Sequence, residues 1–128
     1  FMDNTNLPAW YWPRGLHDAI IVQVLRCDRP QWIDGTYYHN SLTLSLDPRN
    51  ALWDTTVSTI TMLNYKVLSD DFDPTGCWWV SDTLRQVDSK YLLNIQLGNY
   101  EKHKAGNKTY TVRFTHCIVE RLPKSARE

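Results

Sequence analysis

The sequence places an imidazole and a carboxylate side by side at His17 and Asp18, the residue types of a general acid–base pair. They open an apolar segment over residues 16–26, which we predict to be a β-strand buried on much of both faces. Adjacent residues on a strand point to opposite sides, so these two side chains are not expected to act as one pair. We interpret them first as polar residues that pin the N-terminal segment, with a ligand-binding or catalytic role as the alternative.

A second candidate for chemistry is an Asp-rich loop whose spacing partly matches a calcium-binding loop. The first, third, fifth, sixth and twelfth positions of such a loop are occupied by Asp71, Asp73, Thr75, Gly76 and Asp82. Pro74 is unfavourable inside the loop, and both flanking segments resemble strands where helices are needed. The sequence therefore favours a solvated turn over a calcium site.

The other residue types that serve as nucleophiles or metal ligands are dispersed. The four histidines show neither H-x-H nor H-E-x-x-H spacing, and lie at His17, His39, His103 and His116. There is no phosphate-binding glycine motif and no G-x-S-x-G. We expect no cofactor and no metal, and an enzyme is the least favoured class because several of these side chains would have to converge in one cleft, namely His17, Asp18, His39 or His116.

The three cysteines, Cys27, Cys77 and Cys117, are odd in number and lack C-x-x-C spacing. Such thiols are typical of a reducing compartment. No export signal is visible, and we expect a cytoplasmic protein.

Aromatic residues are abundant, with six tryptophans and seven tyrosines in 128 residues. Most are expected in the core, but exposed aromatic rings anchor protein interfaces and stack on sugars. Trp78 and Trp79 point to opposite faces of a regular strand, so we expect one to be exposed and take Trp79 as the candidate. Trp12 and Trp32 join it as candidate partner-binding residues, with His17 and Asp18.

Length and charge limit the number of domains and the kinds of partner that the chain can have. The chain fits one domain over residues 2–128, since Phe1 before Met2 is interpreted as the remnant of a tag. Fourteen basic and fourteen acidic residues give zero net charge, which argues against nucleic acid as a partner. No apolar run is long enough to span a membrane, so no membrane contact is expected.

The pattern predicts an all-β fold, an antiparallel sandwich or partly open barrel of about six strands. Strands are expected at 16–26, 37–47, 56–68, 78–87, 91–97 and 110–121, preceded by an aromatic arm at 2–15 and followed by a basic tail at 122–128. Asp34-Gly35 and Asp88-Ser89-Lys90 are predicted turns. In the last strand the inward side is predicted to carry Tyr110, Val112, Phe114, His116 and Ile118.

The run Leu16-His17-Asp18-Ala19, followed by alternating apolar residues, resembles small uncharacterised bacterial β-rich domains, together with the segments 41–46, 91–98 and 111–119. Some similar sequences are immunity proteins encoded beside polymorphic toxins. The resemblance implies an interaction role and brings no catalytic residue set. We therefore expect a non-catalytic protein-interaction domain, for which the resemblance implies the immunity kind, and keep a carbohydrate-binding module as the alternative.

Overall fold

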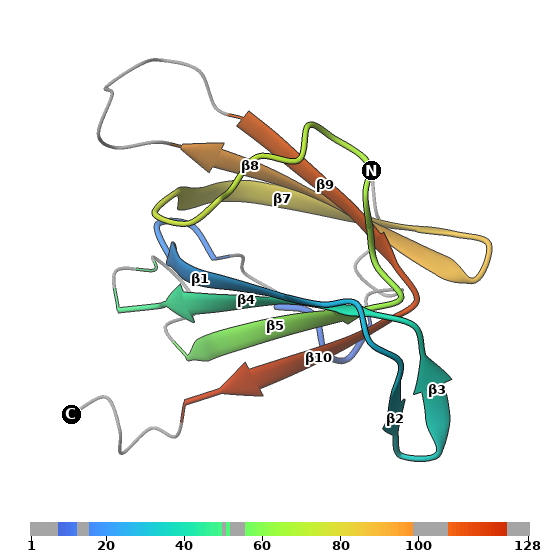
Figure 1. The fold of residues 1–128 in the computed structure, drawn as a ribbon. Coiled ribbons are helices and arrows are strands. Elements are labelled where there is room, and N and C mark those ends of the chain that lie inside the picture. Colours follow the sequence, from blue (N-terminus) through green and yellow to red (C-terminus); the bar gives the residue numbers. More distant parts are fainter. Residues whose placement is uncertain (1–7, 13–15, 50, 52–55, 99–107, 123–128) are drawn as a thin grey trace.

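The computed structural model describes residues 8–12, 16–49, 51, 56–98 and 108–122, which form an all-β fold (Figure 1). The strands are β1 (Ile20–Cys27), β2 (Gln31–Ile33), β3 (Thr36–Tyr38), β4 (Ser41–Asp47), β5 (Val57–Leu63), β6 (Lys66–Val67), β7 (Trp78–Val87), β8 (Lys90–Gly98), β9 (Lys108–Phe114) and β10 (His116–Arg121). The predicted fold class is confirmed, in its open form: the large sheet does not close into a barrel. Among the described residues no helix is long and apolar enough to cross a membrane.

Eight strands form one antiparallel sheet that folds over on itself as two layers (Figure 1). One layer has the order β10-β5-β4-β1 and the other β7-β8-β9-β6. Between β1 and β7 the ladder pairs Ile20 with Trp78, and backbone hydrogen bonds from Ile21 to Cys77 and from Trp79 to Ala19 extend this short junction between the layers. The hairpin of β2 and β3 forms a separate two-stranded sheet.

Two strands bend at the same level and carry the chain from one layer to the other. β5 continues into β6 through Asn64, whose φ is +55°, and β9 continues into β10 through Thr115. The Asn64 amide donates to Thr115 Oγ1 over 3.0 Å, and the Thr115 backbone N–H donates to the carbonyl of Leu63 over 3.0 Å. The predicted single strand over 56–68 is therefore two strands.

The bend at Thr115 also overturns part of the predicted inward face of the last strand. Tyr110, Val112 and Phe114 are buried as predicted, but His116 and Ile118 are exposed. Because the alternation restarts after the bend, the inward positions of β10 are occupied by the residues between them.

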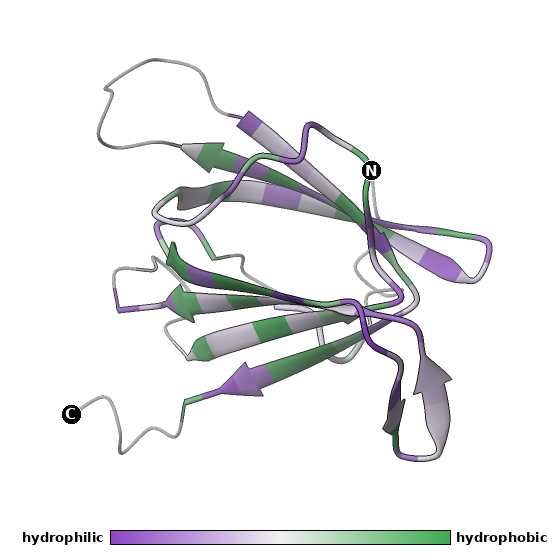
Figure 2. Ribbon diagram, in the orientation of Figure 1, coloured by the Kyte–Doolittle hydropathy of each residue, from purple (hydrophilic) through white to green (hydrophobic). Residues whose placement is uncertain are grey.

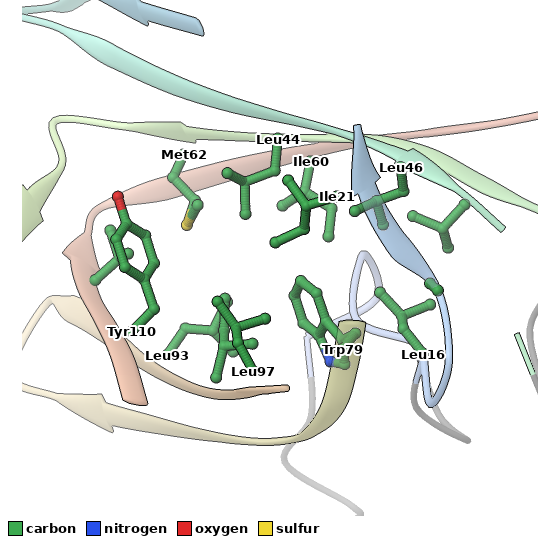
Figure 3. Packing of buried hydrophobic residues seen from close by; sticks show 14 of the residues in the cluster. Leu16, Ile21, Leu44, Leu46, Ile60, Met62, Trp79, Leu93, Leu97 and Tyr110 are labelled. Atoms are coloured by element: carbon green, nitrogen blue, oxygen red, sulfur yellow. The ribbon is translucent and has the colours of Figure 1, made fainter. Parts of the chain in front are cut away.

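The core lies between the two layers. Figure 3 shows Leu44, Ile60 and Met62 of one layer facing Leu93, Leu97 and Tyr110 of the other. The predicted alternation of β4 is confirmed, because Leu42, Leu44 and Leu46 are buried, and Figure 2 shows it as alternating bands of colour. Burial of these side chains on one face of each layer is the main stabilising contribution to a sandwich of this size.

β1 is less buried than predicted. Ile21 is fully buried, but Val22 and Leu25 are exposed, and a bulge between Ile21 and Gln23 shifts the register with β4. The expectation that the strand over 16–26 is buried on much of both faces is wrong at Val22 and Leu25. Nothing among the described residues covers the outward side of the layer at these positions.

The described part of the predicted arm, residues 8–12, packs into the fold. Trp12 is buried, and the ring of Trp10 contacts the rings of Tyr91 and Phe114 at centroid distances of 5.5 and 5.9 Å. The rest of the arm predicted over 2–15, and the predicted tail at 122–128 apart from Leu122, lie outside the described residues.

Candidate functional site

The β2–β3 hairpin projects from the two-layered sheet (Figure 1). Its turn is the predicted Asp34-Gly35, with φ of +51° and +80°. Positive φ at both central residues is the geometry of a type I′ turn, which glycine and aspartate tolerate better than other residues. The turn prediction is confirmed, whereas strands of only three residues on either side were not foreseen.

One side of this hairpin is aromatic and open to solvent. Trp32 and Tyr37 are paired across the two strands, with exposed fractions of 72% and 38% and a centroid distance of 5.3 Å. His39 is also exposed, and its ring contacts that of Tyr37 at 5.0 Å. We call Trp32, Tyr37 and His39 the aromatic face of the hairpin.

The opposite side of the hairpin fastens it to the sheet. Tyr38 is buried and its ring contacts His116 of β10 at 5.2 Å. Gln31 donates to the sulfur of Cys27 over 3.1 Å, and the backbone N–H of His39 donates to Asn64 Oδ1 over 2.7 Å. These contacts fix the base of the hairpin, so the aromatic face is presented on a structure that is already formed.

The outward side of the β10-β5-β4-β1 layer adjoins the hairpin. Its two central strands carry small hydroxyl residues in register, and the Oγ1 atoms of Thr43 and Thr61 lie 3.0 Å apart. Leu25 and Ile118, which are exposed, flank them on the neighbouring strands. This row of the face has small hydroxyls at its centre and aliphatic groups beside them, and in the adjoining row Glu120 of β10 accepts a hydrogen bond from Thr59 Oγ1 over 2.9 Å.

Trp79 and Trp12, two of the three predicted surface tryptophans, are core residues, so the expectation that they are exposed is wrong. Trp79 is 0% and Trp12 1% exposed, and their rings meet edge to face at 5.5 Å. The strand alternation was predicted correctly, but Trp79 is on the inward side. Its neighbour Trp78 is partly buried.

Asp82 of β7 explains why both tryptophans are inside. Its Oδ2 accepts hydrogen bonds from the indole N–H groups of Trp12 at 2.9 Å and Trp79 at 2.8 Å, and its Oδ1 accepts one from the Tyr11 hydroxyl. A buried indole needs an acceptor, and one carboxylate supplies it for both. Burial, together with the adjacent carboxylate, raises the pKa of Tyr11 well above its ordinary value.

His17 and Asp18 lie on a turn and not on a strand, which corrects the first expectation about them. The backbone N–H of Ala19 donates to the carbonyl of Leu16 over 2.9 Å, and Asp18 has φ of +74°, as in the third residue of a type II turn. This turn places His17 Nε2 at 3.5 Å from Asp18 Oδ1, so the two side chains do form a pair. Leu16 and Ala19, the first and last residues of the turn, are both buried and anchor it on both sides.

The pair has a defined orientation. His17 Nδ1 lies 2.7 Å from the carbonyl oxygen of Val80, which can only accept, so Nδ1 carries the proton and Nε2 faces the carboxylate. Val80 is at a register shift in β7, which turns its carbonyl toward the imidazole. This contact ties the turn to β7 and supports the interpretation of the two residues as a pin for the N-terminal segment.

Among the described residues, His17 and Asp18 do not converge with His39 and His116 in one cleft, as the enzyme interpretation would require. His39 contacts Tyr37 and His116 contacts Tyr38, both at the hairpin, whereas His17 contacts β7. Within the described part of the chain, no group of three or more His, Cys, Asp or Glu side chains is arranged to hold a metal ion.

The carboxylates of the Asp-rich loop point to separate partners. Asp71 forms a bidentate ion pair with Arg26, which lowers the pKa of Asp71, and Asp73 accepts hydrogen bonds from the backbone and hydroxyl of Thr75. Asp82 is on β7 beneath the arm. The loop is thus an Asp-rich turn in which local hydrogen bonds and an ion pair use the oxygens that a cation would need.

The cysteines that were expected to be reduced are free thiols in the structure. Burial raises the pKa of Cys77, and raises that of Cys117 to about 12, so both thiols are neutral near pH 7.

Comparisons with protein families, with curated proteins and with solved structures find no match to this chain. The resemblance to immunity-type domains therefore stays a prediction, and the function has to be argued from the chain's own surface.

The sequence singled out Trp32 as a partner-binding residue, whereas His39 was considered only for an enzyme cleft and Tyr37 was missed. The turn signal at Asp34-Gly35 was a usable clue, because a two-residue turn places Trp32 opposite Tyr37 on one side of a hairpin.

Proposed function

We propose that this chain is a non-catalytic protein-binding domain that contacts its partner through the aromatic face of the β2–β3 hairpin. The observation that carries the proposal is Trp32, 72% exposed on a hairpin that stands apart from the main sheet. Tryptophan is among the residues most enriched at the energetic centres of protein interfaces, and its burial by a partner removes a large apolar surface from water.

The surroundings of the hairpin support the same role. The outward side of the β10-β5-β4-β1 layer, with Leu25 and Ile118, offers a flat surface on the side where Tyr38 meets His116. A partner seated there could cover both surfaces. The fixed base of the hairpin lowers the ordering cost of binding.

The sequence resemblance suggests the partner to test first. An immunity-type role makes that partner a bacterial toxin, met in the cytoplasm. Such a partner would be bound by surface complementarity, which needs no set of catalytic side chains.

Capture experiments with matched variants test the proposal. The tagged full chain, Trp32→Ala and Val87→Ala are each used to capture proteins from lysate of the source cells, and the captured proteins are quantified by mass spectrometry. Val87 is a suitable control because it is an exposed apolar residue at the end of β7, outside the β2–β3 hairpin. We expect the wild type and Val87→Ala to capture the same partner and Trp32→Ala to capture at least about tenfold less. Equal capture by Trp32→Ala would contradict the proposed surface.

A further inference from the structure

A groove that reaches His116, beside the base of the β2–β3 hairpin, forms where three segments distant in sequence meet. The arm supplies Pro8 and Trp10, the β7–β8 hairpin supplies Gln86, Ser89 and Tyr91, and the bend into β10 supplies Thr115, His116 and Cys117. The groove has a volume of about 580 Å³. Volumes of this order are typical of small-molecule sites.

Two aromatic rings in the groove are held in place by other rings. Trp10 contacts Tyr91 at a centroid distance of 5.5 Å and an interplanar angle of 86°, and Tyr91 stacks on Phe114 at 5.8 Å and 28°. Trp10 also contacts the rings of Tyr11 and Trp12, which Asp82 fixes. The aromatic wall is therefore preorganised, and a ligand would not have to order it.

The polar groups of the groove keep hydrogen-bonding capacity that the protein does not use. Gln86 and Ser89 make no side-chain hydrogen bond within the described part of the chain, and His116 uses only Nδ1, at 3.1 Å from Thr115 Oγ1. An amide, a hydroxyl and an imidazole nitrogen thus face the groove with capacity to donate and accept.

The described lining of the groove is unfavourable for a charged ligand. Among the described residues that line it there is no Lys, Arg, Asp or Glu, and the thiol of Cys117 is neutral because burial raises its pKa. Moving a charged ligand out of water into this groove would lack a compensating partner charge. A ligand with several hydroxyl groups and an apolar C–H face can exchange hydrogen bonds with Gln86, Ser89 and His116 and pack against the rings.

From this arrangement we propose that the groove between Trp10, Gln86, Tyr91 and His116 binds a neutral carbohydrate unit. The sugar would place a C–H face against the exposed ring surface of Trp10 or Tyr91 and exchange hydrogen bonds with Gln86 and His116. This site is distinct from the aromatic face of the β2–β3 hairpin and does not depend on the protein-binding proposal.

Calorimetric titration of the full chain tests the site. The probes are maltose, cellobiose, lactose and N,N′-diacetylchitobiose, each to about 10 mM, with glucuronic acid as a charged comparison. We expect at least one neutral disaccharide to bind with a Kd of about 1 mM or tighter and glucuronic acid to bind at least tenfold more weakly, which is about 1.4 kcal/mol.

Variants assign the binding to this groove. Gln86→Ala and His116→Ala should each weaken binding by about three- to tenfold, the range for one lost hydrogen bond. Gln23→Ala, an exposed amide on β1, should leave it unchanged, and thermal unfolding of every variant verifies the fold, since His116 also contacts Tyr38. Trp32→Ala should bind sugar normally, which separates this proposal from the preceding one.

Three results would overturn the proposal: no heat from any neutral disaccharide at about 10 mM, binding that persists unchanged in both groove variants, or binding lost only in Trp32→Ala. The last result would move carbohydrate binding to the hairpin.

Discussion

The N-terminal arm and the β2–β3 hairpin are both rich in aromatic residues but have opposite environments. In the arm, Trp12 is buried and its indole N–H is bound to Asp82, 70 positions away in the sequence. In the hairpin, Trp32 is largely exposed, and its ring contacts that of Tyr37 on the adjoining strand.

The difference shows that aromatic content alone does not locate a binding surface. What decides is whether the fold supplies both an apolar environment and a hydrogen-bond acceptor for the indole, as Asp82 does for Trp12 and Trp79. The hairpin offers Trp32 neither the cover nor a comparable acceptor among the described residues, so a partner would have to supply the cover. Substitutions in the core, the arm and the hairpin test this contrast.

Trp79→Ala should have the largest effect. The side chain is fully buried between the two layers, and its removal leaves a large cavity, which typically costs about 3–5 kcal/mol. Urea unfolding followed by circular dichroism measures the loss. A change below about 1 kcal/mol would show that Trp79 is not a core residue.

Asp82→Ala should be the next most damaging substitution. It leaves the donors of Tyr11, Trp12 and Trp79 without their acceptor, and we expect a loss of about 2–3 kcal/mol in the free energy of unfolding. Asp82→Asn keeps an acceptor oxygen and should lose less. If the two variants were equally stable, the hydrogen bonds to this side chain would not be what holds the arm.

The arm should also respond to alkaline pH. Because the pKa of Tyr11 is higher in the folded chain than its ordinary value of 10.0, the unfolded chain loses this proton first as the pH rises. The free energy of unfolding therefore falls above about pH 10, with a slope of at most about 1.4 kcal/mol per pH unit for this one proton.

Tyr11→Phe isolates that contribution. The variant should show a shallower decline in stability above about pH 10, measured by urea unfolding at a series of pH values. Tyr110 provides a background, since burial raises its pKa to about 12 as well and it remains in the variant. An unchanged slope would rule out Tyr11 as a source of the alkaline sensitivity.

Trp32→Ala should have the smallest effect on stability. The residue is exposed, and substitution at such a site usually changes the free energy of unfolding by no more than about 0.5 kcal/mol. The same urea experiment checks this beside Trp79→Ala. A loss of more than about 2 kcal/mol would mean that the hairpin tryptophan is part of the protein's own packing, and the comparison between arm and hairpin would fail.

The fold class was predictable because it depends on local patterns. Strict alternation over 41–47 and 91–97 identified β4 and most of β8, and Asp88-Ser89 identified the turn between β7 and β8. The bend at Thr115 was not predictable in this way, since it depends on a hydrogen bond to Leu63, which is distant in sequence.

The candidate sites were less predictable for the same physical reason. Whether Trp79 or Trp78 faces inward depends on the acceptor that Asp82 offers, and Asp82 was considered only for its spacing in the Asp-rich loop. The pairing of His17 with Asp18 depends on a turn with positive φ at a non-glycine residue, a conformation that strand periodicity does not report.

The separation of Trp12 from Asp82 also sets a delay during synthesis. Tyr11 and Trp12 leave the ribosome before Asp82, whose carboxylate accepts their hydrogen bonds and which follows them 71 and 70 positions later. At roughly 5–20 residues per second, this interval is several seconds. During it the aromatic segment Trp10–Trp12 lacks the acceptor that holds it in the folded chain, which makes this segment a natural target for a chaperone.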